Sequence, residues 1–587
     1  MSTIIVISSK PWKYLLGALL ALIILIPLWI LFVMTVVQPD SLMTQEQTMG
    51  NRLLWWVAGP VGIVTVLFGG RWMLASQTAH AKQTESQVQV HQVAPDAAKG
   101  PDYVLEIIGL GVTLDKYRQG KLWEALQGGS PQLSIREQDP KKYAWSQMER
   151  SGTTGERYGS SLENGAQYTP MYWGVPVFNA GAPKENPADK DSPINPEPGL
   201  VGGAVSSGMA WHLFVIGPRR FEERPDRIME EVFAFFDANP DVPYVVVNSA
   251  DDMYSRDLSR APGSPTLMKD GYYIPEMPDA STLFVLARRE RVDAVRPFVF
   301  DDVEEGKVSM DVLNAKGFAR RLFLAYSALE RAVPHPDKEK DPQAKTERQP
   351  LISEWLPAAA AFSHRPDIAG TRPISLLESA NPWAHRPPKD WKPTPWFPIP
   401  WNKDQLATFD RLPTLGFVHR PTFVKFTDEH GTPVTRRDDR EKLLQAGWQQ
   451  ALQSLPEAER KKAPARVITG NGGNTDQTIL LHSLLNDYAS HGGPELTAGK
   501  GNKLIDTDKR LGNTGAATWF VQMAIGVMGS YREGGVSAAV NLRDPNEASI
   551  VFISPPSDEK RKNQKHPNGG DVFAHHGSPA IDPDNYK

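Results

Sequence analysis

Two long apolar runs near the N-terminus place the strongest constraint on this chain of 587 residues. Residues 14–37 are almost unbroken in apolar character, and residues 53–70 form a shorter uncharged run that begins near two tryptophans. About twenty apolar residues span a bilayer, and tryptophans favour its interface. The first run is too long for a cleaved signal peptide. We therefore expect two transmembrane helices within residues 1–74, followed by a polar tether over residues 75–100.

Basic residues near these runs predict the orientation of the hairpin. Lys10 and Lys13 precede the first run, whereas Arg71 and Lys82 follow the second. The connecting loop has Arg52 as its only basic residue. Because cytoplasmic flanks carry an excess of Lys and Arg, both ends of the hairpin should face the cytoplasm, together with the large soluble region.

The middle of the chain alternates strand-like and helix-like segments. Residues 210–216, 244–247 and 283–287 are short apolar runs typical of buried strands, and residues 224–239 carry a helical apolar stripe. This β-α-β order predicts an α/β fold in which helices cover a parallel or mixed sheet. The first soluble unit is expected to occupy residues 101–333.

A second α/β unit is predicted over residues 414–556. Its expected strands are residues 466–469 and 549–553, and its helices are residues 442–455, 476–488 and 516–528. In the helix at 476–488 we expect Ile479, Leu480, Leu484 and Leu485 to point inward.

The segment between the two units, residues 334–413, is rich in proline and tryptophan. Dense prolines exclude regular helix over most of it, and dense tryptophans are not expected in a disordered chain. We predict an ordered arm whose tryptophans either pack on the chain's own body or form a surface for a partner. Residues 557–587 are predicted to be a flexible tail in which His575 and His576 hold no metal.

Charge and cysteine content exclude some classes of function. The formal net charge is −4, without the basic footprint that nucleic-acid binding usually requires. The chain has no cysteine, which excludes disulfides and thiolate metal sites. We expect no bound metal and no cofactor.

Several candidate site residues have a structural alternative. His212 lies in an apolar run, where a core histidine is a simpler explanation than a catalytic one. Asp251 and Asp252 follow a strand end, where ligand sites of open α/β sheets gather, so they either bind a metal or cap a turn. Gly109 and Gly111 suggest a turn after a strand, but the third glycine of a dinucleotide loop is replaced by Leu114.

The glycine-rich loop at residues 470–475 follows a predicted strand and precedes a helix. Such loops can cradle phosphate, but the lysine of a P-loop is absent. The sequence also contains neither a Gly-x-Ser-x-Gly elbow nor a His-Glu-x-x-His zinc motif.

This loop and residues 509–517 (KRLGNTGAA) resemble the C-terminal half of β-ketoacyl synthases of the thiolase superfamily. In those enzymes two histidines act as acid or oxyanion donors beside a cysteine nucleophile. Here the histidine positions correspond to Asn471 and Asn513, and no thiolate exists to carry an acyl group. The resemblance implies two thiolase-like halves with mixed sheets covered by helices, and a vestigial pocket that contains both asparagines.

A second resemblance covers more of the chain. Residues 103–118, 135–140, 171–176, 208–214 and 270–289 are similar to the type VI secretion lipase adaptor proteins. That family has an N-terminal and a C-terminal adaptor domain. Membership implies a protein on the cytoplasmic side of the bacterial inner membrane, which binds a phospholipase effector and helps load it onto the type VI secretion spike protein.

Two hypotheses of different class therefore stand. The first is a non-catalytic adaptor whose partners are a phospholipase effector, the secretion spike protein and, through the hairpin, the membrane. The alternative is a divergent acyltransferase or acyl-binding protein of the thiolase superfamily. Tests of acyl-CoA binding and of effector pull-down would separate the two.

Overall fold

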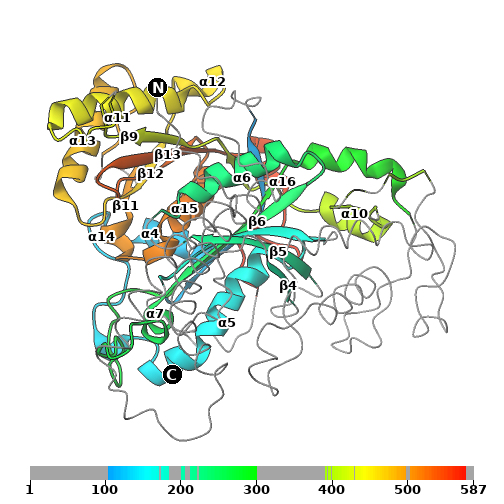
Figure 1. Cartoon of the computed structure of the whole chain (residues 1–587), viewed down its shortest axis with the longest axis horizontal. Helices are drawn as coiled ribbons and strands as arrows, with labels where there is room; N and C mark the ends of the chain where they lie inside the picture. Colours follow the sequence, from blue (N-terminus) through cyan, green and yellow to red (C-terminus); the bar gives the residue numbers. More distant parts are fainter. Residues whose placement is uncertain are drawn as a thin grey trace, which may run out of the picture. The chain divides into compact units, whose positions relative to one another are not determined.

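The computed structural model (Figure 1) describes the chain from residue 103 to residue 576, with gaps. The predicted hairpin, the tether, most of the arm and residues 577–587 lie outside the described residues. Among the residues that the structure describes, no helix is long and apolar enough to cross a membrane. The described ranges are 103–170, 174–183, 200–204, 212–220, 224–300, 390–392, 394, 396–397, 400–428, 430–497 and 503–576.

Thirteen strands of the described chain form one mixed sheet. The strands of the N-terminal half are β1 (Leu105–Leu114), β2 (Tyr117–Arg118), β3 (Val175–Gly181), β4 (Leu200–Ala204), β5 (His212–Arg220), β6 (Tyr244–Asp251) and β7 (Ala280–Ala287). Those of the C-terminal half are β8 (Gly416–Val418), β9 (Thr422–Lys425), β10 (Arg466–Gly470), β11 (Leu504–Asp506), β12 (Ser537–Asn541) and β13 (Glu547–Ser554).

The two halves repeat the same strand arrangement. In the N-terminal half β3 is parallel to both β5 and β6, and β7 is antiparallel to both β6 and β1. In the C-terminal half β10 is parallel to both β11 and β12, and β13 is antiparallel to both β12 and β8. The halves meet where β1 pairs antiparallel with β8. The prediction of two α/β halves with mixed strand pairing is confirmed, although their strands join into a single sheet.

Helices accompany these strands in both halves. The N-terminal half contributes α4 (Gly120–Gly128), α5 (Gln147–Ala166), α6 (Arg227–Ala238), α7 (Met253–Leu258) and the 3₁₀ turns Pro140–Lys142, Arg289–Ala294 and Arg296–Phe298. The remainder contributes α10 (Lys403–Asp410), α11 (Arg437–Leu452), α12 (Glu457–Arg460), α13 (Thr475–Ser490), α14 (Thr507–Leu511), the 3₁₀ turn Gly515–Ala517, α15 (Thr518–Glu533) and α16 (Asp558–Asn563).

The central helix is α15, which is buried at every position from Thr518 to Tyr531. It packs against β10, β12 and β13 of its own half and against β7 and β1 of the other. Phe520 on this helix lies 6.1 Å from Phe284 on β7, measured between ring centroids. A helix that is apolar on all sides must be buried, and α15 satisfies this by lying between strands of both halves.

The predicted turn at Gly109 and Gly111 is wrong, because β1 continues through both residues to Leu114. A Cβ added at Gly111 would lie 1.7 Å from the carbonyl oxygen of Ser161, and one at Gly109 would lie 2.1 Å from that of Gly165. The glycines therefore allow the backbone of α5 to approach the strand closely.

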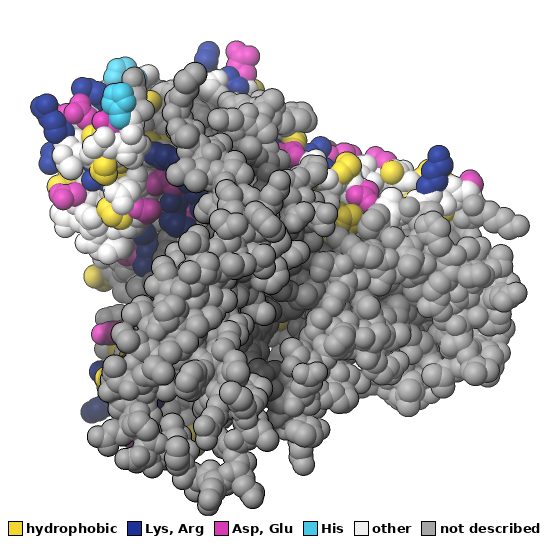
Figure 2. All heavy atoms as spheres, in the orientation of Figure 1, with side chains coloured by type: hydrophobic (Ala, Val, Ile, Leu, Met, Phe, Trp, Pro, Cys, Tyr) yellow, Lys and Arg dark blue, Asp and Glu magenta, His cyan; other side chains and the backbone are white. Residues whose placement is uncertain are grey.

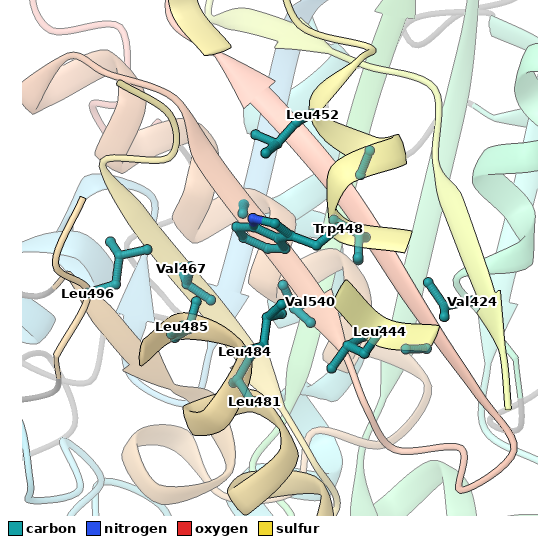
Figure 3. Packing of buried hydrophobic residues seen from close by; sticks show 14 of the residues in the cluster. Val424, Leu444, Trp448, Leu452, Val467, Leu481, Leu484, Leu485, Leu496 and Val540 are labelled. Atoms are coloured by element: carbon teal, nitrogen blue, oxygen red, sulfur yellow. The ribbon is translucent and has the colours of Figure 1, made fainter. Parts of the chain in front are cut away.

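The core of the C-terminal half lies beneath α11 and α13. Side chains of both charge signs cover the outer surface of these helices (Figure 2). Their inner faces pack around Trp448 (Figure 3). The ring of Trp448 lies 5.6 Å from the rings of Phe552 and Tyr488. Leu481 joins this core, whereas Ile479, predicted to point inward, is 37% exposed. The prediction for Ile479 is wrong because the helical period turns that position outward.

The predicted flexible tail is packed as far as residue 576. Phe573 is buried, its carbonyl accepts a hydrogen bond from the N–H of Gly120 at 3.1 Å, and its ring lies 5.3 Å from that of Tyr531. The N–H of His576 donates to Oδ1 of Asn164 at 2.8 Å. A few apolar and hydrogen-bonding residues fix this segment despite its Gly- and Asp-rich composition.

The described tryptophans of the predicted arm pack on the body of the chain. Trp401 is fully buried, with its ring 5.2 Å from that of Phe409, and Phe409 in turn stacks on Tyr244 of β6 at 6.2 Å. Trp396 donates from Nε1 to Oδ1 of Asn239 at 3.1 Å and lies 5.6 Å from the ring of Phe235. Of the two alternatives for the arm, packing on the chain itself holds for these residues.

Candidate functional site

A hollow of about 390 Å³ lies where α6 of the N-terminal half meets α15 and the segment after β12. This volume falls in the range of small-molecule sites, roughly 300–1,000 Å³. The described residues that line it are Arg224, Pro225, Gly515, Thr518, Trp519, Asn541, Arg543, Asp544 and Pro545.

The hollow adjoins the carboxyl ends of the parallel strands in the C-terminal half. Because β10 is parallel to both β11 and β12, Gly470, Asp506 and Asn541 end these strands at the same edge. Ligand sites of open α/β sheets gather at such edges. The two loops that carry the predicted asparagines leave from this edge or next to it.

Asn513 lies at the margin of the hollow. Its Oδ1 accepts hydrogen bonds from Nη2 of Arg543 at 2.8 Å and from the N–H of Gly515 at 3.0 Å. Nη1 of Arg543 donates in turn to Oγ1 of Thr518 at 2.6 Å. Asn513 and Arg543 therefore link the turn before α15 to the segment after β12.

Asn471 is buried, and its side chain is held within its own loop. Its Oδ1 accepts from the N–H of Gly473 at 2.9 Å, and its Nδ2 donates to Oγ1 of Thr478. A Cβ added at Gly472 would lie 3.8 Å from Cγ of Arg543. The structure thus places Arg543 beside both predicted loops, and of the two asparagines it is Asn513 that accepts a hydrogen bond from it.

The sequence analysis missed the arginines at this site. Arg224 binds the carboxylates of Asp226 at 2.9 Å and Asp544 at 3.2 Å, and it also contacts Glu547. Arg227 binds Glu547 at 2.5 Å. These ion pairs join the start of α6 to the loop and strand after β12. The charged residues between 541 and 547 could have indicated ion pairs. Their partners, Arg224 and Arg227, lie more than 300 residues earlier in the sequence.

No activated nucleophile lines the hollow among the described residues. Thr518 provides a hydroxyl, but Oγ1 donates its proton to the carbonyl of Gly515 at 2.8 Å. Neither histidine nor cysteine occurs in the described lining. A nucleophile needs an adjacent base or a lowered pKa to act, and this lining provides neither.

A serine–histidine contact occurs elsewhere, between His419, which follows β8, and Ser554 at the end of β13. Nε2 of His419 lies 2.8 Å from Oγ of Ser554, but that hydroxyl donates to the carboxylate of Glu459 at 2.8 Å. In a catalytic triad the carboxylate orients the histidine instead. Both Ser554 and His419 are buried, and burial lowers the pKa of His419. The arrangement is a polar link between strands.

Asp251 and Asp252 have structural roles. The carboxylate of Asp251 binds Arg256 at 2.7 Å and accepts from the N–H of Ala516 at 2.8 Å. Asp252 caps α7 by accepting from the N–H of Ser255 at 2.8 Å. Within the described residues no cluster of His, Asp and Glu is suited to hold a metal ion. The capping interpretation therefore applies to Asp252, and Asp251 joins the two halves.

Solved structures similar to this chain are ketosynthases and related synthases. A ketosynthase from module 1 of the bacillaene synthase of Bacillus amyloliquefaciens FZB42 is 9% identical, with a TM-score of 0.34 and coverage of 78% of this chain and 77% of that one. The 3-oxoacyl-(acyl carrier protein) synthase III of Xanthomonas oryzae pv. oryzae is 11% identical, with a TM-score of 0.31 and coverage of 77% and 99%.

Two family models match the sequence, one on each half. Residues 103–270 match the "Type VI lipase adapter protein Tla3, N-terminal" family, and residues 415–555 match its C-terminal counterpart. Together these matches cover more than half of the chain, from the residues before β1 to α7 and from β8 to β13. The chain therefore belongs to the family of type VI lipase adapter proteins.

Proposed function

We propose that this protein is a non-catalytic adaptor that binds a type VI secretion phospholipase effector and helps load it onto the secretion spike. The observation that carries the proposal is the match of both halves to the lipase adapter family. An adaptor needs a stable scaffold with surfaces for two partners, and it needs no reacting group.

The chemistry of the hollow supports a role without catalysis. The chain has no cysteine to accept an acyl group. The amides of Asn471 and Asn513 take part in hydrogen bonds within and between loops. An asparagine can donate a hydrogen bond but cannot exchange a proton near neutral pH. These residues hold loops together, which is sufficient for a scaffold.

We place the protein at the bacterial inner membrane, with its soluble region in the cytoplasm. This part of the proposal rests on the two apolar runs and on the basic residues that flank them. A reporter fused after Lys587 should behave as cytoplasmic. Alkaline phosphatase activity from that fusion would contradict the orientation.

The hollow between the halves supports one alternative, a protein that binds acyl groups. Its volume of about 390 Å³ would accommodate a short acyl chain. Purified protein titrated with acyl-CoA would test this alternative, and saturable binding would favour it.

The adaptor function is tested by co-purification of the full chain with a type VI secretion phospholipase of the same bacterium, in a mild detergent because of the apolar runs. We expect the two proteins to elute together and the secretion spike protein to join them. Lipase that elutes alone under conditions where both proteins are folded would overturn the proposal.

A further inference from the structure

Exposed large apolar side chains are concentrated on one part of the N-terminal half. Six such side chains occur among the described residues, and five of them lie between residues 133 and 272. Their exposed fractions range from 40% to 80%, and the sixth, Ile479, is on α13. We call the five the apolar patch: Leu133, Met148, Leu258, Leu267 and Tyr272.

Hydrogen bonds hold two of these residues beside each other. Leu258 ends α7, and Leu267 belongs to the loop that follows it. The carboxylate of Asp257 accepts from the N–H of Leu267 at 2.6 Å and from the hydroxyl of Thr266 at 3.0 Å. The loop therefore folds back on the end of α7, so that the backbone of Leu267 lies next to Asp257, the residue before Leu258.

The same loop continues to the start of α5. The N–H of Gln147 donates to the carbonyl of Gly271 at 2.9 Å, and the hydroxyl of Tyr272 reaches Glu149 at 3.4 Å. These contacts set Tyr272 beside Met148, which is 80% exposed.

The segment that carries Leu133 reaches the far end of the loop through Arg136, three residues farther on. Arg136 donates from Nη2 to the carbonyl of Pro275 at 2.5 Å and from Nη1 to that of Glu276 at 3.2 Å. The residues next to Leu133 bond to the C-terminal half, because Oγ of Ser134 and the N–H of Ile135 donate to the carbonyl of Arg510 at 3.1 and 3.0 Å. The five residues therefore lie on segments joined to one another by hydrogen bonds.

The segments that carry the patch also contribute to a buried cluster. Met253, Met268 and Met277 form this cluster, with Tyr254 packed against it. Nη2 of Arg150 lies 3.2 Å from Sδ of Met268 and 3.4 Å from the hydroxyl of Tyr273. The apolar side chains are exposed because the fold holds them outward, which lowers the cost of ordering them in a complex.

The size of the patch suits a protein partner. At roughly 200 Å² for a large side chain, the five exposed fractions amount to on the order of 600 Å². A stable interface takes about 800 Å² from each partner. The patch with a polar rim would meet that requirement.

The charges at the rim are nearly balanced. Exposed charged residues of both signs occur in the segments that carry the patch, namely Lys141, Lys142, Lys269, Asp270 and Glu276. A partner that binds by net charge, such as nucleic acid or an anionic membrane, would need an excess of basic residues. The patch therefore fits an apolar protein surface.

We propose that the apolar patch is the surface that docks the lipase, by contact with the apolar surface through which a lipase admits its acyl substrate. This inference rests on the adaptor function proposed above. A lipase must expose an apolar entrance to bind an insoluble substrate, and an adaptor that covers it also shields the entrance before secretion. Methionine and tyrosine suit such a surface, because the first is flexible and the second is rigid and amphipathic.

The test is the affinity of the purified full chain for the purified lipase, measured by calorimetry. Met148→Asp and Leu258→Asp place a charge at exposed positions, so folding is retained, and unchanged thermal melting verifies this. We expect each to weaken binding by about tenfold or more, as for central interface residues. The matched control is Ile479→Asp on α13, which should stay within about twofold of the wild type.

The outcomes separate this inference from the adaptor function. Absence of binding by the wild-type chain would overturn the adaptor function and the inference together. Equal binding by wild type and both patch variants would overturn the docking surface alone. A wild-type dimer that Met148→Asp dissociates without changing lipase affinity would assign the patch to a second copy of this chain, and would likewise overturn the inference.

Discussion

The two halves share one strand order but stabilise it in different ways. In the C-terminal half α11 and α13 cover the strands with an apolar core around Trp448. In the N-terminal half α5 packs through small and polar residues, and its own Arg150 and Arg157 are buried against Asp279. The repeated strands provide the scaffold, and the segments added around α5 provide the exposed apolar patch.

The difference shows where each half can tolerate change. An apolar core loses stability gradually as its volume changes, whereas a buried ion pair fails when either partner is removed. The half that carries the proposed docking surface is thus also the half with the more demanding polar core. The four predictions that follow set one half against the other.

The largest effect is expected for Asp279→Asn. Asp279 binds Arg157 at 2.5 Å and faces Arg150 at 3.9 Å, and all three side chains are buried. Loss of the negative charge should lower the free energy of unfolding by about 3–5 kcal/mol, because two buried cations lose their counter-charge. Urea denaturation would measure it.

The matched control in the C-terminal half is Glu533→Gln, which breaks a pair with Arg466 at 3.4 Å where Glu533 is 41% exposed. That change should cost about 1 kcal/mol or less. Similar losses in the two variants would remove the contrast between the halves.

The second comparison is between two glycines at helix–strand contacts. A Cβ at Gly111 would meet the backbone carbonyl of Ser161 at 1.7 Å, whereas one at Gly447 on α11 would meet the side chain of Val424 at 2.1 Å. Backbone cannot yield as a side chain can, so Gly111→Ala should lower the unfolding free energy by about 3 kcal/mol. Gly447→Ala should cost about 1 kcal/mol, since the strain is partly offset by helix propensity. A larger loss for Gly447→Ala would contradict this account.

The third prediction concerns pH and the packed tail. The ring of His566 stacks on that of His576 at 4.0 Å, and burial, followed by the charge of His576, lowers the pKa of His566 to about 4. The unfolded chain takes up this proton near pH 6.5, but the folded chain does so only near pH 4. As the pH falls from 6.5 to 4, the free energy of unfolding should therefore decrease by about 1–2 kcal/mol.

Hydrogen exchange at residues 564–576 should accelerate as pH falls through this window, after correction for the intrinsic rate. His566→Gln should reduce the effect. Burial also lowers the pKa of His419 in the C-terminal half, so a pH dependence that survives unchanged in His566→Gln would point to that residue.

The smallest effect is expected for Asn471→Ala. The lost amide holds its own loop through Gly473 and Thr478, so the cost should be about 1 kcal/mol. Lipase affinity should not change, because the loop lies outside the apolar patch. A loss of acyl turnover in this variant, measured against robust wild-type activity, would show that the site is catalytic.

The sequence predicts those elements that carry a clear apolar pattern. Strands β6, β7 and β10 and helices α6 and α13 fall where their periodicity places them, within a few residues. Helix α5 was missed because its buried face consists of Gly, Ser, Thr and Arg instead of an apolar stripe. Gly109 and Gly111 were wrongly predicted to form a turn, because glycine is favoured both in turns and where a helix approaches a strand closely.

The candidate site is predicted less completely than the fold. The loops of Asn471 and Asn513 were identified, but Arg543 was not, because its link to Asn513 is a tertiary contact. The apolar patch leaves no sequence signal, since exposure of Met148 or Leu258 depends on how the loop after α7 folds back. Ion pairs such as that of Arg224 with Asp544 join residues that are hundreds of positions apart, and a local sequence pattern does not reveal them.

The most direct test of the central claim is hydrogen exchange of the full chain with and without the lipase. The account predicts protection of residues 146–149 and 253–273, with the loops at residues 470–475 and 512–515 unchanged. Protection confined to those two loops, or to α11 and α13, would contradict it.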